Sequence, residues 1–119
     1  MFKLLVGPLA ALFVMSANSQ TADLKVTGRQ GFQVFLTVSE PWSMDPAYLE
    51  RALRWACTGS DACVSHIWKT GDAAPKSLPL TEKAVETELA TLQLNKKTGR
   101  DELLWNCKRV VVRDKSRCF

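Results

Sequence analysis

The stretch with the greatest potential for chemistry runs from Arg54 to Trp68 (RWACTGSDACVSHIW). It contains Cys57, Cys63 and His66, the single histidine of the chain. Two thiols beside an imidazole can bind zinc, can form a catalytic cysteine with its base, or can be scaffold joined by a disulfide. A zinc site commonly contains a Cys-x2-Cys or His-x3-His half-site, whereas the spacing here is Cys-x5-Cys-x2-His. We therefore expect no metal site and no cofactor.

The first nineteen residues have the three-part layout of a secretory signal peptide. Lys3 supplies a positive charge, an apolar run follows from Leu4 to Val14, and residues 16–19 supply a cleavage site. The apolar run is shorter than the roughly 20 residues that span a bilayer. We expect residues 1–19 to be the signal peptide and residues 20–119 to form one domain without a membrane span. The protein is then periplasmic or secreted.

The export signal bears on the cysteines, because thiols outside the cytoplasm are oxidised. The four cysteines, Cys57, Cys63, Cys107 and Cys118, predict two disulfides and leave three possible pairings. On closeness along the chain we expect the pairs Cys57–Cys63 and Cys107–Cys118. A catalytic thiolate would need a reduced cysteine, which this compartment disfavours.

No other pattern in the sequence indicates catalysis. The twelve carboxylates are scattered, and the chain has no Gly-x-Ser-x-Gly, no phosphate-binding glycine loop and no His-Glu-x-x-His. His66 alternates with Val64 and Trp68 and is expected to be a packed or edge residue of a strand. We predict no catalytic residue and a protein that is not an enzyme.

One aromatic pair is a candidate binding site. Tyr48 and Trp55 lie seven residues apart in a predicted helix, on one flank of its apolar stripe. Two rings on a flank could stack on a sugar or dock a partner protein. The alternative is that the sheet or the loop at 69–80 covers both rings. The other tryptophans are expected in the core: Trp42, Trp68 and Trp105.

The elements that position these residues begin with two strands and a helix. Period-two alternation predicts a strand at 32–38, which glycines separate from a shorter strand at 24–27. Asp45 as N-cap and Pro46 as first residue predict a helix that ends near Cys57. Its apolar stripe comprises Leu49, Ala52, Leu53, Ala56 and Cys57.

The second half of the chain is expected to contain two more strands and one more helix. We predict a strand at 64–68, a loop at 69–80, a helix from Thr81 to about Gln93, a turn at 95–100 and a strand from Glu102 to Val112. The order β-β-α-β-α-β predicts a small single-domain α+β fold with a mostly antiparallel sheet.

Positive charge is concentrated towards the C-terminus. From Lys96 onward there are eight basic and three acidic residues. Such a segment could contact an anionic partner or simply be a solvated face, and we expect no nucleic-acid partner.

The chain resembles two groups of known proteins, the first through motifs in its second half. These motifs are Ile67-Trp68, Ala74-Pro75, Leu78-Pro79-Leu80-Thr81, Asn95, Thr98-Gly99-Arg100-Asp101 and Leu104-Trp105-Asn106-Cys107. They resemble small exported bacterial proteins without an assigned function. The resemblance covers about a third of the chain and implies a compartment, with no activity attached.

The second resemblance is to the cysteine-rich glucan-binding module of plant β-1,3-glucanases. The segment LERALRWACTGSDAC (Leu49–Cys63), with Trp105-Asn106-Cys107 and the closing Cys118-Phe119, is similar to that family. The module has six cysteines, and this chain lacks the first and the fourth. The resemblance implies the Cys57–Cys63 bridge and suggests Tyr48 and Trp55 as sugar contacts.

Together these observations predict an exported protein whose partner is another protein or a glycan. The first possibility is an interaction protein, such as an inhibitor or an immunity-type protein that caps a toxin or a hydrolase. The second is a glycan-binding module, and the third is an enzyme of an unrecognised type.

Overall fold

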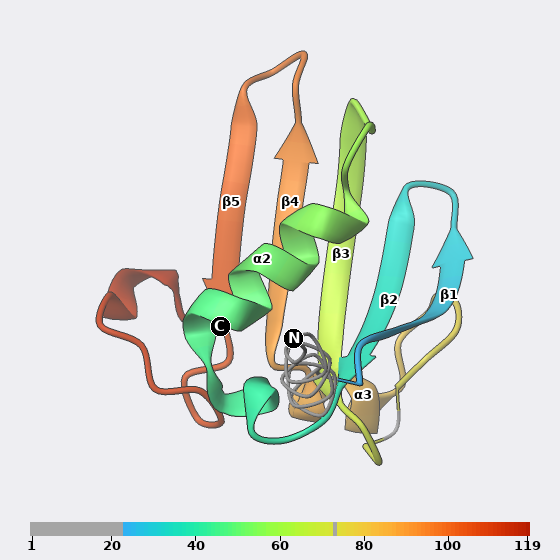
Figure 1. Ribbon diagram of the computed structural model, residues 1–119. Helices are drawn as coiled ribbons and strands as arrows, with labels where there is room; N and C mark the ends of the chain where they lie inside the picture. The colour runs from blue at the N-terminus through green and yellow to red at the C-terminus, as the bar shows by residue number, and fades with distance from the viewer. Residues whose placement is uncertain (1–22, 73) are drawn as a thin grey trace, which may run out of the picture.

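The computed structural model describes residues 23–72 and 74–119, which are built around one five-stranded sheet (Figure 1). The elements in chain order are β1 (Lys25–Gln30), β2 (Gln33–Val38), η2 (Trp42–Met44), α2 (Pro46–Ala56), β3 (Ala62–Lys69), α3 (Glu82–Thr87), β4 (Ala90–Asn95), β5 (Arg100–Trp105) and η3 (Lys115–Arg117). The α+β class is confirmed. The predicted signal peptide and the predicted mature start at Gln20 lie outside the described residues.

The strands of the sheet lie in chain order, β1-β2-β3-β4-β5. Strands β2 and β3 are parallel, whereas β1–β2, β3–β4 and β4–β5 are antiparallel, so the prediction of a mostly antiparallel sheet is confirmed. Helix α2 makes the connection between β2 and β3, because parallel neighbours need a long crossover and cannot be joined by a tight turn. The carboxyl ends of β2 and β3 therefore lie at the same end of the sheet.

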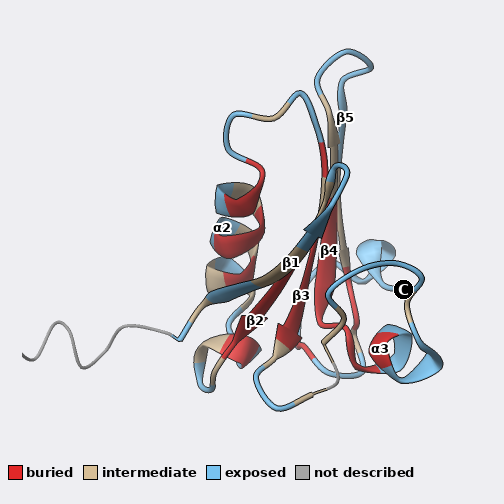
Figure 2. Ribbon diagram, turned by 90° about the vertical axis from the view of Figure 1, so that its right-hand side faces the viewer, coloured by how far each residue is buried: buried red, intermediate tan, exposed pale blue. Residues whose placement is uncertain are grey.

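Helix α2 covers one face of the sheet (Figure 2). Its N-cap is Asp45, whose carboxylate accepts hydrogen bonds from two free backbone N–H groups of the first turn, and Pro46 is the first helical residue. The helix ends with Cys57 as C-cap, as predicted. The predicted apolar stripe is buried against Val34, Leu36, Val38, Ile67 and Leu92 of the sheet.

The opposite face of the sheet carries a smaller apolar cluster, in which Phe35 and Trp68 pack with Ala84 of α3. Trp68 Nε1 donates to the Ala84 carbonyl at 2.8 Å, so the single indole donor is satisfied. The loop between β3 and α3 crosses β1 here, and the backbone of Lys76 fills the space that a Cβ at Gly28 would occupy. This close approach requires glycine at position 28.

The first hairpin is confirmed with shifted bounds. Strand β1 continues through Gly28 to Gln30, and the chain reverses at Gly31, where φ is 60°. That left-handed conformation favours glycine. Phe32, which we expected to begin the next strand, lies in the turn and is exposed.

The second helix is shorter than predicted, and its predicted end is wrong. Helix α3 has the predicted N-cap, Thr81, but ends at Thr87 and not near Gln93. Residues 90–95 form β4 instead, because a strand there gains backbone partners on both sides, β3 and β5, and buries its first three residues. The turn predicted at 95–100 closes the β4–β5 hairpin, so the observed order is β-β-α-β-α-β-β.

The last strand also ends earlier than predicted, at Trp105 and not at Val112. Asn106 turns the chain, since its backbone carbonyl accepts from the Val110 N–H at 3.0 Å. The valine run that predicted a strand is divided as a result, with Val110 buried and Val111 exposed. Packing of the Asn106 turn outweighs the β propensity of the valines.

Both predicted disulfides are confirmed. Cys57–Cys63 joins the end of α2 to β3, and Cys107–Cys118 joins the turn after β5 to the C-terminal segment. All four cysteines are therefore oxidised, and none is available as a thiolate.

Candidate functional site

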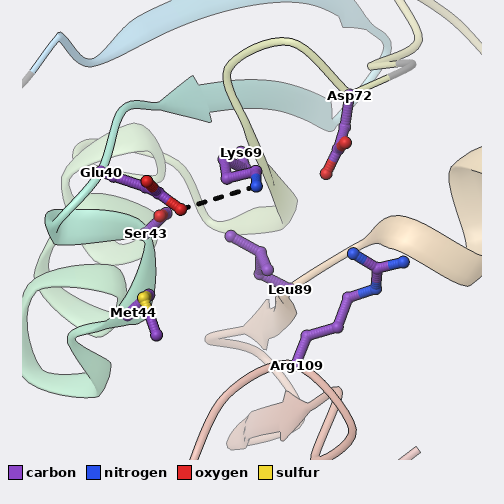
Figure 3. Close-up of a pocket in the computed structure, with 7 residues that line it drawn as sticks. All are labelled: Glu40, Ser43, Met44, Lys69, Asp72, Leu89 and Arg109. Atoms are coloured by element: carbon purple, nitrogen blue, oxygen red, sulfur yellow. Dashed lines mark ion pairs between the residues drawn. The ribbon is translucent and has the colours of Figure 1, made fainter.

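A pocket lies at the end of the sheet where the parallel strands β2 and β3 finish (Figure 3). Glu40 follows β2 by two residues, and Lys69 is the last residue of β3. The carboxyl ends of parallel strands are the usual place for ligands in sheets with helical crossovers, because the loops diverge there around a crevice. The pocket has a volume of about 220 Å³ and opens to solvent.

Segments from four places in the chain supply the walls: the segment after β2 with η2, the end of β3 with its turn, the residue before β4, and the turn after β5. The fold therefore creates the pocket, and no local motif does. The seven lining residues, all labelled in Figure 3, are Glu40, Ser43, Met44, Lys69, Asp72, Leu89 and Arg109.

Backbone hydrogen bonds fix the turns that carry two polar residues of the pocket, Ser43 and Asp72. The Ser43 N–H donates to the Ser39 carbonyl at 3.2 Å, in the turn that leads into α2. The Asp72 N–H donates to the Lys69 carbonyl at 3.0 Å, in a turn where Gly71 has a φ of 101°. Because the main chain makes both turns, the side-chain oxygens of Ser43 and Asp72 remain available to a ligand.

Asn106 fixes the third polar wall, which carries Arg109. Its side-chain amide donates to the carbonyls of Glu86 at 3.1 Å and Glu88 at 2.8 Å, and its backbone carbonyl accepts from the Arg109 N–H at 3.0 Å. This buried asparagine ties the end of α3 to the turn after β5. Cys107, the next residue, forms the disulfide with Cys118, which anchors this turn to the C-terminal segment.

The polar groups of the pocket are poorly paired with one another. Ser43 Oγ and Asp72 Oδ2 are both buried, and neither has a hydrogen-bond partner among the described residues. Arg109 forms no ion pair with a described residue, whereas Lys69 Nζ lies 3.6 Å from a carboxylate oxygen of Glu40. Most buried polar groups in proteins have partners, and leaving one unpaired costs about 1–3 kcal/mol. Unpaired groups that line one pocket are what a binding site needs, because a ligand can supply the missing partners.

His66 belongs to a separate polar cluster on the face of the sheet opposite α2. Its Nδ1 lies 2.8 Å from Glu88 Oε2 and its Nε2 lies 2.7 Å from Gln33 Oε1, while its ring stacks on Phe35 with centroids 5.3 Å apart. Burial raises the pKa of the Glu88 carboxyl, and the hydrogen bond and charge of His66 oppose that rise. Both ring nitrogens are occupied and the ring is buried, so the prediction of a packed histidine is confirmed.

The structure does not bring Tyr48 and Trp55 together as a pair of rings. Trp55 is 55% exposed on α2, on the side away from the sheet. Tyr48 is half-buried, packs against Trp42 with ring centroids 6.3 Å apart, and has the Arg51 guanidinium 5.8 Å from its ring centre. Their role in binding remains a prediction.

The remaining tryptophans lie in or against the core. Trp68 and Trp105 are buried, and Trp42 is half-buried against the α2 side of the core. These three placements agree with the expectation from the sequence.

Sequence reasoning did not identify the pocket. One signal was available, since a helix between two strands predicts a parallel pair whose carboxyl ends share one edge. That argument leads to Glu40 and Lys69. Asp72 lies in a loop and Arg109 in a segment we predicted as strand, so their convergence on the same pocket depends on the tertiary fold.

Two kinds of feature are absent from the described residues, 23–72 and 74–119: clustered metal ligands and membrane-spanning helices. These residues contain no group of three or more His, Cys, Asp or Glu side chains placed to hold a metal ion. Nor do they contain a helix with the length and apolar character needed to cross a membrane. Comparison with known proteins found no family model, no curated protein and no solved structure that matches the chain.

Proposed function

We propose that this protein is an exported interaction protein, periplasmic or secreted, that binds another protein by receiving one of its side chains in the pocket. The observation that carries the proposal is the pair of buried oxygens that line one pocket and have no hydrogen-bond partner in the part of the chain the structure describes, Ser43 Oγ and Asp72 Oδ2. A partner side chain with suitable donors and acceptors would satisfy both oxygens and remove the cost of leaving them unpaired.

The size of the pocket supports a side chain as the ligand. Its volume of about 220 Å³ is below the roughly 300–1,000 Å³ of typical small-molecule sites. Met44 lies on the pocket and is 63% exposed, and methionine adapts its shape well at protein-binding surfaces. A small pocket with an adaptable methionine beside it suits an inhibitor or an immunity-type protein.

The disulfides support export. Two disulfides in a small domain persist outside the cytoplasm, where thiols are oxidised. The N-terminal signal-peptide pattern points to the same compartment.

A glycan-binding module is the second candidate, and the exposure of Trp55 favours it. A single exposed indole can stack on a sugar ring. Tyr48 packs on Trp42 and is not free to form a second stacking surface beside it. We therefore place the glycan second.

The test is site-specific photo-crosslinking in the exported fraction of the source organism. A photo-crosslinking amino acid in place of Met44 should trap one protein, and trapping should be lost when Arg109→Met is added and kept when Trp55→Ala is added. The control is the same amino acid in place of Val85, which is 51% exposed on α3 and lies outside the pocket. Equal trapping from both positions would contradict the proposal. Retention on insoluble glucan that Trp55→Ala abolishes would support the glycan module instead.

A further inference from the structure

We propose that the pocket recognises a primary carboxamide, the side chain of a glutamine or asparagine that the partner protein inserts. This inference rests on the proposed function and adds the chemistry of the recognised group. Its basis is two buried oxygens without a hydrogen-bond partner among the described residues, Ser43 Oγ and Asp72 Oδ2, and the exposed Arg109 guanidinium beside them, which forms no ion pair with a described residue.

The donors and acceptors of the pocket match those of an amide. In Figure 3 the Asp72 carboxylate and the Arg109 guanidinium lie on one side of Leu89, and Ser43 lies on the other. A carboxamide carries N–H donors for Asp72 Oδ2 and a carbonyl acceptor for Arg109. Both hydrogen bonds would involve a charged group of the protein, which makes them stronger than bonds between neutral groups.

The rest of the inserted residue also has contacts available. Its methylene groups can pack on Leu89, the apolar residue in the middle of the pocket. The Ser43 hydroxyl, on the other side of Leu89, can then bond to the backbone of the same residue. One glutamine or asparagine residue would thus bond to both buried oxygens and to the Arg109 guanidinium.

The balance of charge favours a neutral ligand. Two acidic side chains, Glu40 and Asp72, and two basic side chains, Lys69 and Arg109, line the pocket. An inserted carboxylate would meet Asp72, an inserted ammonium would meet Arg109, and either would lose its hydration in the pocket. A carboxamide carries a dipole and no net charge, so it gains from both signs without a like-charge contact.

A sugar could also offer hydroxyl donors and acceptors, but the pocket does not favour one. Sugar rings usually stack on aromatic side chains, and the pocket residues include no aromatic ring. The exposed Trp55 is not among those residues.

The experiment is an NMR titration of the ¹⁵N-labelled protein with small probes. The probes are N-acetyl-glutamine methylamide, its glutamate and lysine counterparts, and methyl glucoside. The three peptide probes share one backbone, so differences between them report the side chain. The glutamine probe should shift the amide signals of Ser43, Asp72, Leu89 and Arg109, and should bind about tenfold more tightly than the other probes. Lys108→Met, next to Arg109 and outside the pocket, is the control variant and should leave this order unchanged.

Two variants should change which probe is preferred. Arg109→Met leaves the acidic side chains in excess and should shift preference to the lysine probe. Asp72→Ala leaves the basic side chains in excess and should shift it to the glutamate probe. A stronger response to methyl glucoside, an unchanged order of probes in both variants, or no response at the pocket signals would each overturn the carboxamide assignment. Crosslinking of a protein through Met44 could still succeed in each case, so the failure of this inference is distinguishable from failure of the proposed function.

Discussion

Ser43 and Ser65 are both buried, yet only the Ser65 hydroxyl has a hydrogen-bond partner among the described residues. Ser65 Oγ donates to the Leu53 carbonyl at 3.0 Å, which ties β3 to α2. Ser43 Oγ faces a pocket and bonds to nothing described. Folding gains nothing from an unpaired hydroxyl, and sites of this kind are often functional, so Ser43 is consistent with the proposed binding function.

We predict that Ser43→Ala and Ser65→Ala will change stability in opposite directions. Removing the unpaired Ser43 hydroxyl should raise the free energy of unfolding by about 1 kcal/mol, because its burial is then no longer unfavourable. Removing the Ser65 hydroxyl should lower that free energy by about 1 kcal/mol, because the Leu53 carbonyl loses its donor. Urea unfolding of both variants and the wild type measures the difference. If Ser43→Ala destabilises the protein as much as Ser65→Ala does, the Ser43 hydroxyl has a structural partner and is not available to a ligand.

The buried Glu88 predicts a specific dependence of stability on pH. Burial raises the pKa of its carboxyl, so the native state holds the proton more tightly than the unfolded chain does. The stabilisation is fully present below the ordinary glutamate pKa and is lost as pH rises through the raised native value. Glu88→Gln keeps a hydrogen-bonding side chain and removes the ionisation.

The stability difference, wild type minus Glu88→Gln, should therefore fall as pH rises from about 4. Urea unfolding at a series of pH values measures it. The control is Glu86→Gln, a neighbouring exposed carboxylate, whose difference from wild type should change less. A Glu88→Gln difference that stays constant or grows with pH would contradict the assignment of burial as the main cause.

At the scale of single residues, the sequence allowed the disulfide pairs to be predicted in full and the surroundings of His66 only in part. The disulfide pairs could be predicted because short loops bring cysteines together. The environment of His66 could be predicted only as packed, since its partners Glu88 and Gln33 lie 22 and 33 positions away in the chain. The partners of a buried polar side chain depend on which residues of neighbouring elements lie opposite it, and a local sequence pattern does not determine this.

At the scale of elements, α2 and β4 show what local patterns can and cannot decide. Helix α2 carries its own start signal, Asp45-Pro46, and a complete apolar stripe, so local and tertiary preferences agree. The segment 85–92, which runs into β4, also places apolar residues at helical spacing: Val85, Leu89 and Leu92. In the fold, pairing with β3 and β5 decides the outcome, and propensity alone could not reveal partners elsewhere in the chain.

The burial of side chains in β5 and α2 can be tested with two tryptophans, Trp105 and Trp55. Trp105 is 8% exposed in β5, where its backbone carbonyl also accepts from the Phe119 N–H at 2.8 Å. Trp55 is 55% exposed on α2. Trp105→Ala should lower the free energy of unfolding by about 3–5 kcal/mol, because it leaves a cavity in the core. Trp55→Ala should change it by less than about 0.5 kcal/mol, as exposed substitutions do.

Thermal unfolding of the two variants side by side makes the measurement. A melting temperature for Trp55→Ala close to that of the wild type, with a strongly lowered value for Trp105→Ala, would agree with the structure. If both variants unfold at the same reduced temperature, the flank of α2 that carries Trp55 contributes to the core and is not a free surface.

At the scale of the whole molecule, the disulfides and the N-terminal pattern make one joint prediction about the exported protein. Material purified from the exported fraction should begin at or near Gln20, and its intact mass should correspond to two disulfides. Mass spectrometry with and without a reductant, together with thiol titration, measures both properties. A full-length chain found only in the cytosol, or free thiols in the native protein, would contradict the proposed compartment.

The two disulfides lie at different distances from the pocket. Removing each of them should therefore distinguish an effect on the free energy of unfolding from an effect on ligand binding. In the chain-entropy account, Cys57–Cys63 closes a short loop worth about 2 kcal/mol, and Cys107–Cys118 closes a longer one worth about 3 kcal/mol. Cys107 lies two residues before Arg109, in the turn that forms one wall of the pocket, whereas Cys57–Cys63 joins α2 to β3 without contributing to the pocket.

The double variants Cys57→Ala with Cys63→Ala, and Cys107→Ala with Cys118→Ala, should both lower the free energy of unfolding by roughly these amounts. Only the second should also shift the Arg109 amide signal and weaken binding of the glutamine probe, because its turn then keeps the Asn106 hydrogen bonds but loses the covalent anchor. Urea unfolding and ¹⁵N NMR on the same samples measure both effects. If the two double variants perturb the Arg109 signal equally, the second disulfide does not position this wall, and the hydrogen bonds of Asn106 are sufficient to hold it.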